Sequence, residues 1–469
     1  MILLDSCKNK RVGVIGLGKT GKVVVDVLIK SGAMVGVYDD GGISDSQYIG
    51  LDLTLLYSRD RNIFSDDWKM LDMMVVSPGI SMLWPRPHPA VSFAHRHNIQ
   101  VINDVDLFQQ QVTDGITICI SGTNGKSTTT ALTGHVFESV NQKTIVGGNF
   151  GVPILLSPVN LDFYIFELSS YQLESCQILG FDTAVLLNVT PDHLMRHGGM
   201  NGYVEAKQRI FANFHEKSNA VVGVDDDYGA LMATFLAQAG HPNVIPISGK
   251  RVPDFGVGWQ DGHLVDNRKG CRGLVCKNIE MLDGDHNRQN IAASYAACIV
   301  NGIGKQEFCN ALSSFSGLPH RQELVTTING IKYVNDSKAT NVQSTEQALL
   351  RFDNIILILG GRPKEEGVEK LIDYFHKIKY AFLIGEAADD WYKIMRLHRV
   401  KCETSSSLES AVNNAYKISK LMDVNVVLLS PACASFDQFK NFEERGDEFR
   451  KYVKRIEEKI NNSYKSQRE

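Results

Sequence analysis

The chain has 469 residues, a formal net charge of −4 and a hydrophobic fraction of 43%. The length predicts about three domains with ordinary cores, and the near-neutral charge excludes the basic footprint of a nucleic-acid-binding protein. No stretch is long and apolar enough to cross a membrane, and residues 1–5 do not resemble a signal peptide. The nine cysteines are dispersed along the chain, which fits reduced thiols in the cytoplasm.

The N-terminal segment begins with a strand that runs into a glycine-rich turn, Gly16-x-Gly18-x-x-Gly21. A helix and a second strand ending at Asp39 follow, which predicts the start of a βαβ unit. The glycines have dinucleotide-fingerprint spacing, and Asp39 stands near the place of a ribose-binding acid. Taken alone, the motif favours NAD or FAD. Any nucleotide diphosphate needs the same glycines, however, and close packing of a helix on a strand needs them too.

Two further strands are predicted in this segment, at 73–76 and 99–102. The first runs into a Ser-Pro-Gly turn at 77–79. A parallel sheet places that turn and the glycine turn at its carboxyl edge, where ligands bind. A polar stretch at 109–114 then ends the first domain, which we assign to residues 1–112.

The central segment opens with an apolar strand at 116–120 and a glycine-rich loop that leads into a helix. Such a loop directs backbone N–H groups and the helix dipole at one point, and Lys126 adds a full charge. This suits a polyphosphate, with the Ser127 hydroxyl placed to hold Mg²⁺. Ile120 replaces the first glycine of the phosphate-loop pattern, and the alternative is a plain turn with a solvated lysine. The loop comprises Gly122, Thr123, Asn124, Gly125, Lys126, Ser127 and Thr128.

Polar residues end the neighbouring strands. The strand at 162–167 ends in Glu167, and the next strand runs into a polar tip that ends at His193. A carboxylate there is a usual second ligand for nucleotide-bound Mg²⁺, and the alternative is an exposed acid. A histidine at this tip favours ligation, although a lone histidine is more often structural. Lys207 is by default a solvated helix lysine, and its spacing gives it no role.

A helix that opens at Gly284 carries Asn287 and Asn290 on its first turn. These two amides would read an adenine or cap the helix. The central domain is assigned to residues 113–316. Strands that alternate with helices in residues 317–469 predict a second doubly wound sheet, and its charged tail from residue 450 is expected to be a solvated helix.

Several strand tips occur in the order and spacing of the Mur ligases of peptidoglycan synthesis. These motifs are G-T-N-G-K-S-T at 122–128, E-L-S-S from Glu167, N-V-T-P-D-H ending at His193, H-R ending at Arg321 and N-D-S-K-A-T-N from Asn335. The N-terminal G-L-G-K-T-G and the C-terminal run S-P-A-C-A-S-F-D-Q-F-K-N-F-E-E-R-G resemble the members that add D-glutamate. The D-N-P-R motif of the diaminopimelate- or lysine-adding members is absent from the sequence.

This resemblance spans all three domains and implies a fold. It implies a Rossmann-like N-terminal sheet, a central domain like the phosphate-loop ATPases and a Rossmann-like C-terminal domain. The implied activity is ATP-dependent joining of D-glutamate to UDP-N-acetylmuramoyl-L-alanine through an acyl phosphate, with Mg²⁺ as cofactor. The implied protein is a cytoplasmic monomer of cell-wall synthesis that binds small molecules and neither nucleic acid nor membrane.

The resemblance also implies roles for individual residues. The UDP-substrate would bind Gly18, Thr20, Asp39, Gly79, Asn149 and His193. ATP would bind the residues of the loop at 122–128 together with Asn287, Arg321 and Asp336. The metal would bind Ser127, Glu167, His193 and Lys207, the last as a carbamate formed with CO₂. The incoming D-glutamate would bind Lys338, Thr340, Lys364, Ser435 and Phe442. The catalytic residues would be Lys126, Glu167, His193 and Lys207.

The sequence departs from the family pattern at Met195, where relatives usually carry an acid, and the assignment of Lys207 depends mainly on its position after Tyr203. Three alternatives stay open. Another ligase of the superfamily, such as the alanine-adding or folylpolyglutamate enzyme, shares the motifs. An NAD(P)-dependent oxidoreductase leaves the loop at 122–128 unexplained, and a nucleotide-binding switch protein needs fewer reactive groups.

Overall fold

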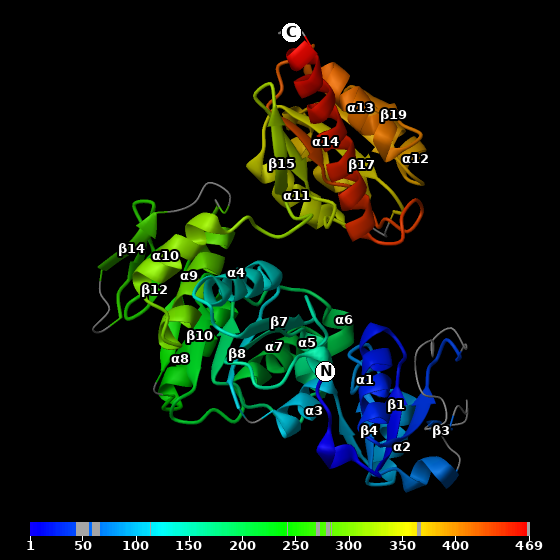
Figure 1. Cartoon of the computed structure of the whole chain (residues 1–469), viewed down its shortest axis with the longest axis vertical. Helices are drawn as coiled ribbons and strands as arrows, with labels where there is room; N and C mark the ends of the chain where they lie inside the picture. The colour runs from blue at the N-terminus through cyan, green and yellow to red at the C-terminus, as the bar shows by residue number, and fades with distance from the viewer. Residues whose placement is uncertain are drawn as a thin grey trace. The chain divides into compact units, whose positions relative to one another are not determined.

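The computed structural model describes residues 1–43, 56–58, 66–112, 114–241, 243–268, 273–277, 282, 284–363 and 367–466. It contains three α/β sheets, which confirms the predicted fold class (Figure 1). Contacts between residues divide the chain into two compact units, Met1–Phe315 and Ser316–Glu469. The finer division at residues 112 and 316 stays a prediction. Among the described residues, no helix has both the length and the apolar character needed to span a bilayer.

The N-terminal sheet has five parallel strands in the order β3-β2-β1-β4-β5. The direction in which strands are added reverses between β1 and β4, which is where ligands bind in open α/β sheets. Its strands are β1 (Arg11–Ile15), β2 (Met34–Tyr38), β3 (Leu56–Ser58), β4 (Met73–Val76) and β5 (Gln100–Ile102). Its helices are η1 (Asp5–Cys7), α1 (Lys19–Lys30), η4 (Asp66–Met70), α2 (Pro89–Arg96) and α3 (Asp104–Gln111).

The central sheet has nine strands in the order β14-β13-β12-β11-β10-β9-β6-β8-β7. It is parallel except at β13 and β14, an antiparallel edge that the sequence analysis missed. Its strands are β6 (Ile116–Ser121), β7 (Thr144–Gly148), β8 (Phe163–Glu167), β9 (Thr183–Leu186), β10 (Asn219–Gly223), β11 (Val244–Ile247), β12 (Val257–Gln260), β13 (His263–Asp266) and β14 (Gly273–Lys277). Its helices are α4 (Lys126–Ser139), η5 (Ile154–Leu156), α5 (Ser170–Ser175), α6 (Leu194–His197), α7 (Met200–Gln208), η6 (Arg209–Phe211), α8 (Asp227–Gln238), α9 (Asp285–Val300) and α10 (Lys305–Ser314).

Strand β6 lies inside this sheet between β8 and β9. Ile118 and Ile120 point into one hydrophobic cluster, and Cys119 points into another. Both faces of the strand are therefore covered, which explains why its sequence is a continuous apolar run instead of an alternating one. The three neighbouring parallel strands bring their carboxyl ends to one edge.

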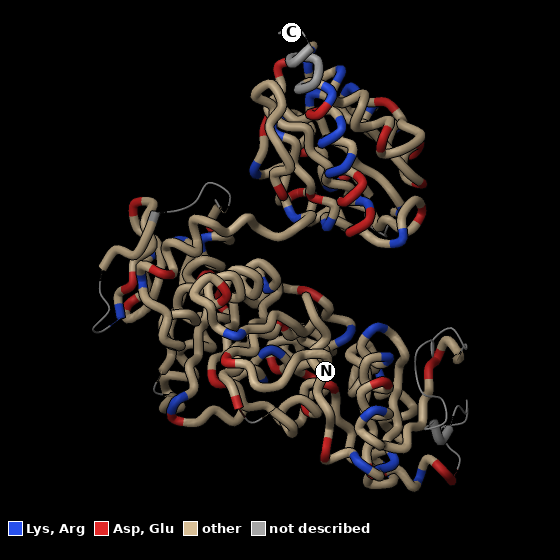
Figure 2. The backbone as a smooth tube through the Cα atoms, in the orientation of Figure 1, with Lys and Arg blue, Asp and Glu red and all other residues tan. Residues whose placement is uncertain are grey.

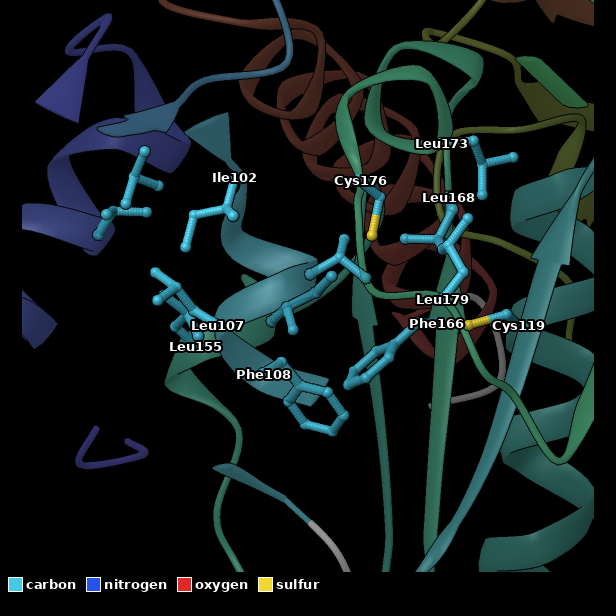
Figure 3. Close-up of a cluster of buried hydrophobic side chains, with 14 of the residues drawn as sticks. Ile102, Leu107, Phe108, Cys119, Leu155, Phe166, Leu168, Leu173, Cys176 and Leu179 are labelled. Carbon is cyan, nitrogen blue, oxygen red and sulfur yellow. The ribbon is translucent and has the colours of Figure 1, made fainter. Parts of the chain in front are cut away.

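The N-terminal and central sheets share one hydrophobic cluster, part of which is shown in Figure 3. Phe108 on α3 makes an edge-to-face contact with Phe166 on β8, at 4.9 Å between ring centroids. Hydrogen bonds also link the two parts. The Asp106 carboxylate on α3 accepts hydrogen bonds from the N–H groups of Gln177 and Ile178 at 2.7 and 2.5 Å. The first two sheets are thus held together by buried contacts.

The C-terminal sheet has six strands in the order β15-β16-β20-β17-β18-β19. Only β15 is antiparallel, and the sequence analysis missed this strand. Its strands are β15 (Glu323–Ile328), β16 (Ile331–Asn335), β17 (Ile355–Gly360), β18 (Ile378–Ile384), β19 (Cys402–Thr404) and β20 (Val426–Leu429). Its helices are α11 (Val342–Arg351), η8 (Val368–Lys377), α12 (Ala388–Leu397), α13 (Leu408–Ser419) and α14 (Phe442–Ser466).

The charged residues of helix α14 predicted a solvated helix, and this prediction is only partly correct. Figure 2 shows basic and acidic residues interspersed along it. Phe449, Val453 and Ile456 are nevertheless buried in a cluster with residues of α13 and the sheet. Three apolar positions spaced by four and three residues place one face of the helix in the core.

We predict that Phe108→Ala lowers the free energy of unfolding of the unit Met1–Phe315 by about 3–5 kcal/mol, because it leaves a cavity where two sheets meet. The matched control is Phe235→Ala on α8, where the side chain is 54% exposed, and this change is expected to stay within about 0.5 kcal/mol. Urea unfolding followed by circular dichroism measures both. Equal effects of the two substitutions would contradict the assignment of Phe108 to the shared core.

Candidate active site

The loop between β6 and α4 has a conformation that requires glycine. Gly125 caps α4 with a φ of +86°, and a Cβ atom there would lie 2.2 Å from Oδ1 of Asn290. The Lys126 ammonium donates hydrogen bonds to the carbonyl oxygens of Gly122 and Thr123, at 2.8 and 2.9 Å. The loop therefore curls around its own lysine at a helix N-terminus, which is an anion-binding arrangement.

Side chains from other elements fix the shape of this loop. Asn188, just beyond β9, accepts a hydrogen bond from the N–H of Asn124 at 2.8 Å and donates one to its carbonyl at 3.1 Å. The same side chain donates to Gln289 on α9 at 3.2 Å. The hydroxyls of Thr123 and Tyr203 lie 3.0 Å apart. The sequence analysis gave Asn188 and Gln289 no role, because a polar residue near a strand tip does not reveal its partner.

Glu167, at the end of β8, is 2% exposed, which excludes the alternative of an ordinary exposed acid. Its Oε1 accepts a hydrogen bond from the Asn149 side chain at 2.7 Å. Its Oε2 is buried and has no hydrogen-bond partner among the residues that the structure describes. A buried carboxylate oxygen without a donor is costly, so this oxygen fits the role of a cation ligand.

Lys207, on α7, is also only 2% exposed, so the default expectation of a solvated lysine is wrong. Its Nζ lies 4.9 Å from the centre of the Tyr203 ring. Burial, followed by the positive charge of Lys126, lowers the pKa of this amine well below its ordinary value, although Asp192 and Glu167 act in the opposite direction. The amine is therefore biased toward the neutral, nucleophilic form.

His193 follows the tip of β9 with a φ of +52° and precedes α6. Its Nε2 lies 3.4 Å from the Asp192 carboxylate, and its ring centroid lies 5.1 Å from that of Tyr171. Met195 is exposed on α6. Within the described ranges, no three side chains of the types His, Cys, Asp and Glu gather as a metal site. The predicted metal set of Ser127, Glu167, His193 and Lys207 stays a prediction.

Helix α9 begins after its N-cap residue Gly284, which makes no side-chain cap, and it carries Asn287 and Asn290 near its start. Asn290 packs against the loop glycine Gly125 and donates to Asn287 at 3.3 Å. Both alternatives for these amides, capping of the helix and binding of adenine, stay predictions.

The N-terminal glycine turn is held by Asp39, which follows β2. Its Oδ2 accepts a hydrogen bond from the N–H of Leu17 at 2.6 Å, and its Oδ1 accepts one from that of Gly41 at 2.9 Å. Gly16 adopts a φ of +86°. Asp39 thus has a structural role at the turn, and its contact with a ligand stays a prediction.

The fingerprint glycines divide into two kinds. A Cβ atom on Gly21 would lie 1.8 Å from the carbonyl oxygen of Gly16, so this glycine is required for close packing. Gly18 and Gly79 have no atom within 4 Å of such a position, and both are exposed. Thr20 lies half-buried on the first turn of α1. The open glycines leave room for a ligand at the helix N-terminus.

In the C-terminal unit, Asp336 follows β16 and is buried. It accepts hydrogen bonds from the Ser430 hydroxyl at 2.7 Å and the Gln322 N–H at 3.1 Å. Burial raises the pKa of this carboxyl to about 7. Arg321, which precedes β15, is half-buried in the same unit. The roles of both residues in binding ATP stay predictions.

The residues expected to bind the amino acid follow two adjacent strands, β16 and β20. Lys338 and Thr340 follow β16, whereas Ser435 and Phe442 follow β20. The Lys338 Nζ lies 6.0 Å from the centre of the Phe442 ring. Lys364 lies outside the described residues. The topology therefore brings four of the five to one edge of the sheet, and their ligand stays a prediction.

The fold and the site together define a class. A phosphate-binding loop at a helix N-terminus, a buried carboxylate and a buried amine characterise an α/β protein that uses a nucleoside triphosphate. Residues 120–298 match the family model described as Mur ligase middle domain, and residues 320–433 match the one described as Mur ligase, glutamate ligase domain. The chain belongs to the Mur ligase family, which uses ATP. This membership sets aside the oxidoreductase and switch-protein alternatives.

Similar proteins match over almost the whole chain. A protein of Rhodospirillum rubrum is 42% identical and covers 97% of this chain and 96% of its own length. One of Rickettsia prowazekii is 39% identical, with 96% and 99% covered. Both are named UDP-N-acetylmuramoylalanine--D-glutamate ligase. The crystal structure of MurF ligase from Thermotoga maritima in complex with ADP is 16% identical, with a TM-score of 0.54 over 97% of this chain and 98% of its own, and supports the fold alone.

The contrast between Gly18 and Gly21 generates a prediction. Gly21→Ala should destabilise the N-terminal fold by about 1–3 kcal/mol, because the new methyl group meets a backbone oxygen. Gly18→Ala should leave stability within about 0.5 kcal/mol and weaken UDP binding about tenfold, because the methyl group covers the helix N-terminus. Thermal unfolding and calorimetric titration with UDP measure the two effects. Unchanged UDP binding by Gly18→Ala would contradict the placement of a ligand at this helix N-terminus.

Proposed function

We propose that the chain is a ligase that uses ATP to join D-glutamate to UDP-N-acetylmuramoyl-L-alanine during synthesis of peptidoglycan precursors. The observation that carries the proposal is the sequence identity of about 40%, over nearly the full length, to relatives named UDP-N-acetylmuramoylalanine--D-glutamate ligase. The matched glutamate ligase domain and the geometry of the loop around Lys126 agree with it.

The chemical problem is to form an amide from a carboxylate, which is a poor electrophile. In the proposed reaction, an alanine carboxylate oxygen attacks the γ-phosphorus of ATP and ADP leaves, which gives an acyl phosphate. The D-glutamate amine then attacks the acyl carbon. The tetrahedral intermediate expels phosphate and the nitrogen loses a proton, so that the products are the amide, ADP and phosphate.

The first step brings two anions together, so the site must supply positive charge. The backbone N–H groups of the loop and the Lys126 ammonium serve this purpose at the phosphates. The metal ligands in the proposal are Ser127, Glu167, His193 and carbamylated Lys207, and the buried, unpartnered Oε2 of Glu167 fits a cation there. Bound Mg²⁺ would offset the phosphate charge.

The burial of Lys207 favours its modification. Its neutral amine can attack CO₂, which forms an N–C bond and, after loss of a proton, a carbamate anion. The lowered pKa of the amine increases the neutral fraction. The new anion would turn the repulsion from Lys126 into attraction and would offer a second carboxylate-like ligand for a cation.

The remaining roles follow the family pattern. The proposed UDP-substrate contacts are Gly18, Thr20, Asp39, Gly79, Asn149 and His193, and the proposed ATP contacts beyond the loop are Asn287, Arg321 and Asp336. The proposed D-glutamate contacts are Lys338, Thr340, Ser435 and Phe442, with Lys364 added from the sequence. We place the reaction in the cytoplasm, with the chain as a monomer. The eight cysteines that the structure describes are all free thiols, which supports a reducing compartment.

Phosphate release tests the substrate assignment. Purified protein with ATP, Mg²⁺ and UDP-N-acetylmuramoyl-L-alanine should release phosphate when D-glutamate is added, and not with L-glutamate, L-lysine or glycine. The product should contain one new amide. Release driven by a different amino acid would assign the chain to another branch of the family.

Two lysine variants separate the proposed roles. Lys126→Ala and Lys207→Ala should each lower kcat by at least about 10³-fold, because both remove electrostatic stabilisation at the transferred phosphoryl group. Added formate or acetate should partly restore Lys207→Ala, since a small carboxylate can replace the carbamate. Lys126→Ala is the matched control and should not respond. A failure to restore Lys207→Ala, or equal restoration of both variants, would count against carbamylation.

A further inference from the structure

We propose that Arg445 is a positioning residue for the amino-acid substrate. In this proposal its buried guanidinium holds together the strand tips of the D-glutamate site and places a positive charge beneath them. The inference depends on the proposed function and deepens it. Arg445 lies in the first turn of α14 and is 0% exposed, so it cannot touch the substrate.

The guanidinium joins segments that are distant in the sequence. Its Nε donates to the Ser337 hydroxyl at 2.9 Å, and its Nη2 donates to the Ser337 carbonyl at 2.8 Å. Both terminal nitrogens donate to the Cys433 carbonyl at 3.2 Å. The Ser337 hydroxyl in turn donates to the Phe442 carbonyl at 2.8 Å. One planar group thus fixes the segment after β16, the segment after β20 and the start of α14.

These contacts are adjacent to the proposed substrate residues. Lys338 directly follows Ser337, and Ser435 lies two positions after Cys433. Phe442 is itself bonded to Ser337. A shift of the guanidinium would therefore move the Lys338 ammonium, the Ser435 hydroxyl and the Phe442 ring together. A displacement of these groups by about 1 Å is expected to weaken substrate binding.

A third strand tip approaches the same group. Gly361 follows β17 with a φ of +131°, and a Cβ atom there would lie 3.3 Å from Nη1 of Arg445 and 2.4 Å from the carbonyl oxygen of Ala434. Strands β16, β20 and β17 are consecutive in the sheet. The guanidinium therefore lies beneath three neighbouring tips, and the glycine gives it room.

Arg445 is a buried cation that makes no hydrogen bond to a carboxylate among the described residues, which is unusual for a residue with a structural role alone. Among the described residues, its hydrogen bonds go to carbonyl and hydroxyl oxygens and to no carboxylate. Burial lowers its pKa to about 10, so it stays cationic at neutral pH, and the carboxylates of Asp437 and Asp336 offset the charge only through space. An unpaired buried cation is costly. A dicarboxylate ligand such as D-glutamate would gain from the positive potential.

Steady-state kinetics of the full chain test this inference. Arg445→Lys keeps the charge and loses the planar set of donors, and Arg445→Met loses both. The KM for D-glutamate should rise about tenfold for Arg445→Lys and about a hundredfold for Arg445→Met, whereas the KM for UDP-N-acetylmuramoyl-L-alanine should change less than about twofold. A smaller rise in the KM for ATP is expected, because Asp336 directly precedes Ser337. The matched control on the same helix is Arg450→Met, which removes an ion pair with Glu323 and should leave all three KM values unchanged.

A uniform rise of all three KM values, or a fall in kcat alone, would overturn the inference, as would an unchanged KM for D-glutamate. If Arg445→Met does not fold by circular dichroism, Arg445→Lys decides the question. The two proposals fail separately. Wild-type protein that is inactive with D-glutamate refutes the proposed function, whereas active wild-type protein with insensitive variants refutes only the role of Arg445.

Discussion

The burial of Lys207 close to the positive charge of Lys126 is the constraint on which the candidate site depends. An ammonium group that is 2% exposed lacks the water that would stabilise it. The fold produces this position, because β6, β8 and β9 are neighbours and parallel and their carboxyl ends meet at one edge. The site therefore favours an anion at Lys207, either a ligand phosphate nearby or the proposed carbamate.

Both units use side-chain hydrogen bonds to hold strand tips in place. In the central sheet, the Asn188 side chain, just beyond β9, bonds to the backbone N–H and carbonyl of Asn124 and so fixes the loop around Lys126. In the C-terminal sheet, Arg445 does this for the tips after β16 and β20. Many functional residues lie on loops, and these side-chain supports give the loops a fixed shape.

The sequence predicts those elements and site residues that depend on a local sequence pattern. The apolar run of β6, the loop around Lys126 and the acid at Glu167 all follow from residues within a few positions of one another. The burial of Lys207 was not predictable from spacing, because its surroundings include Lys126 and Glu167, which are distant in the sequence. The support from Arg445 was missed for the same reason, since its partner Ser337 lies 108 positions away. The antiparallel strands β13, β14 and β15 were missed because their sequences carry a weak apolar pattern.

The central claim is that Lys207 carries an anion made from CO₂. Carbon-13 NMR of the protein equilibrated with ¹³C-bicarbonate tests it most directly, with Lys207→Ala as the reference. The account predicts a carbamate carbonyl signal in the wild-type protein that is lost in the variant. A wild-type spectrum without that signal, or a signal of equal strength in both proteins, would contradict the account.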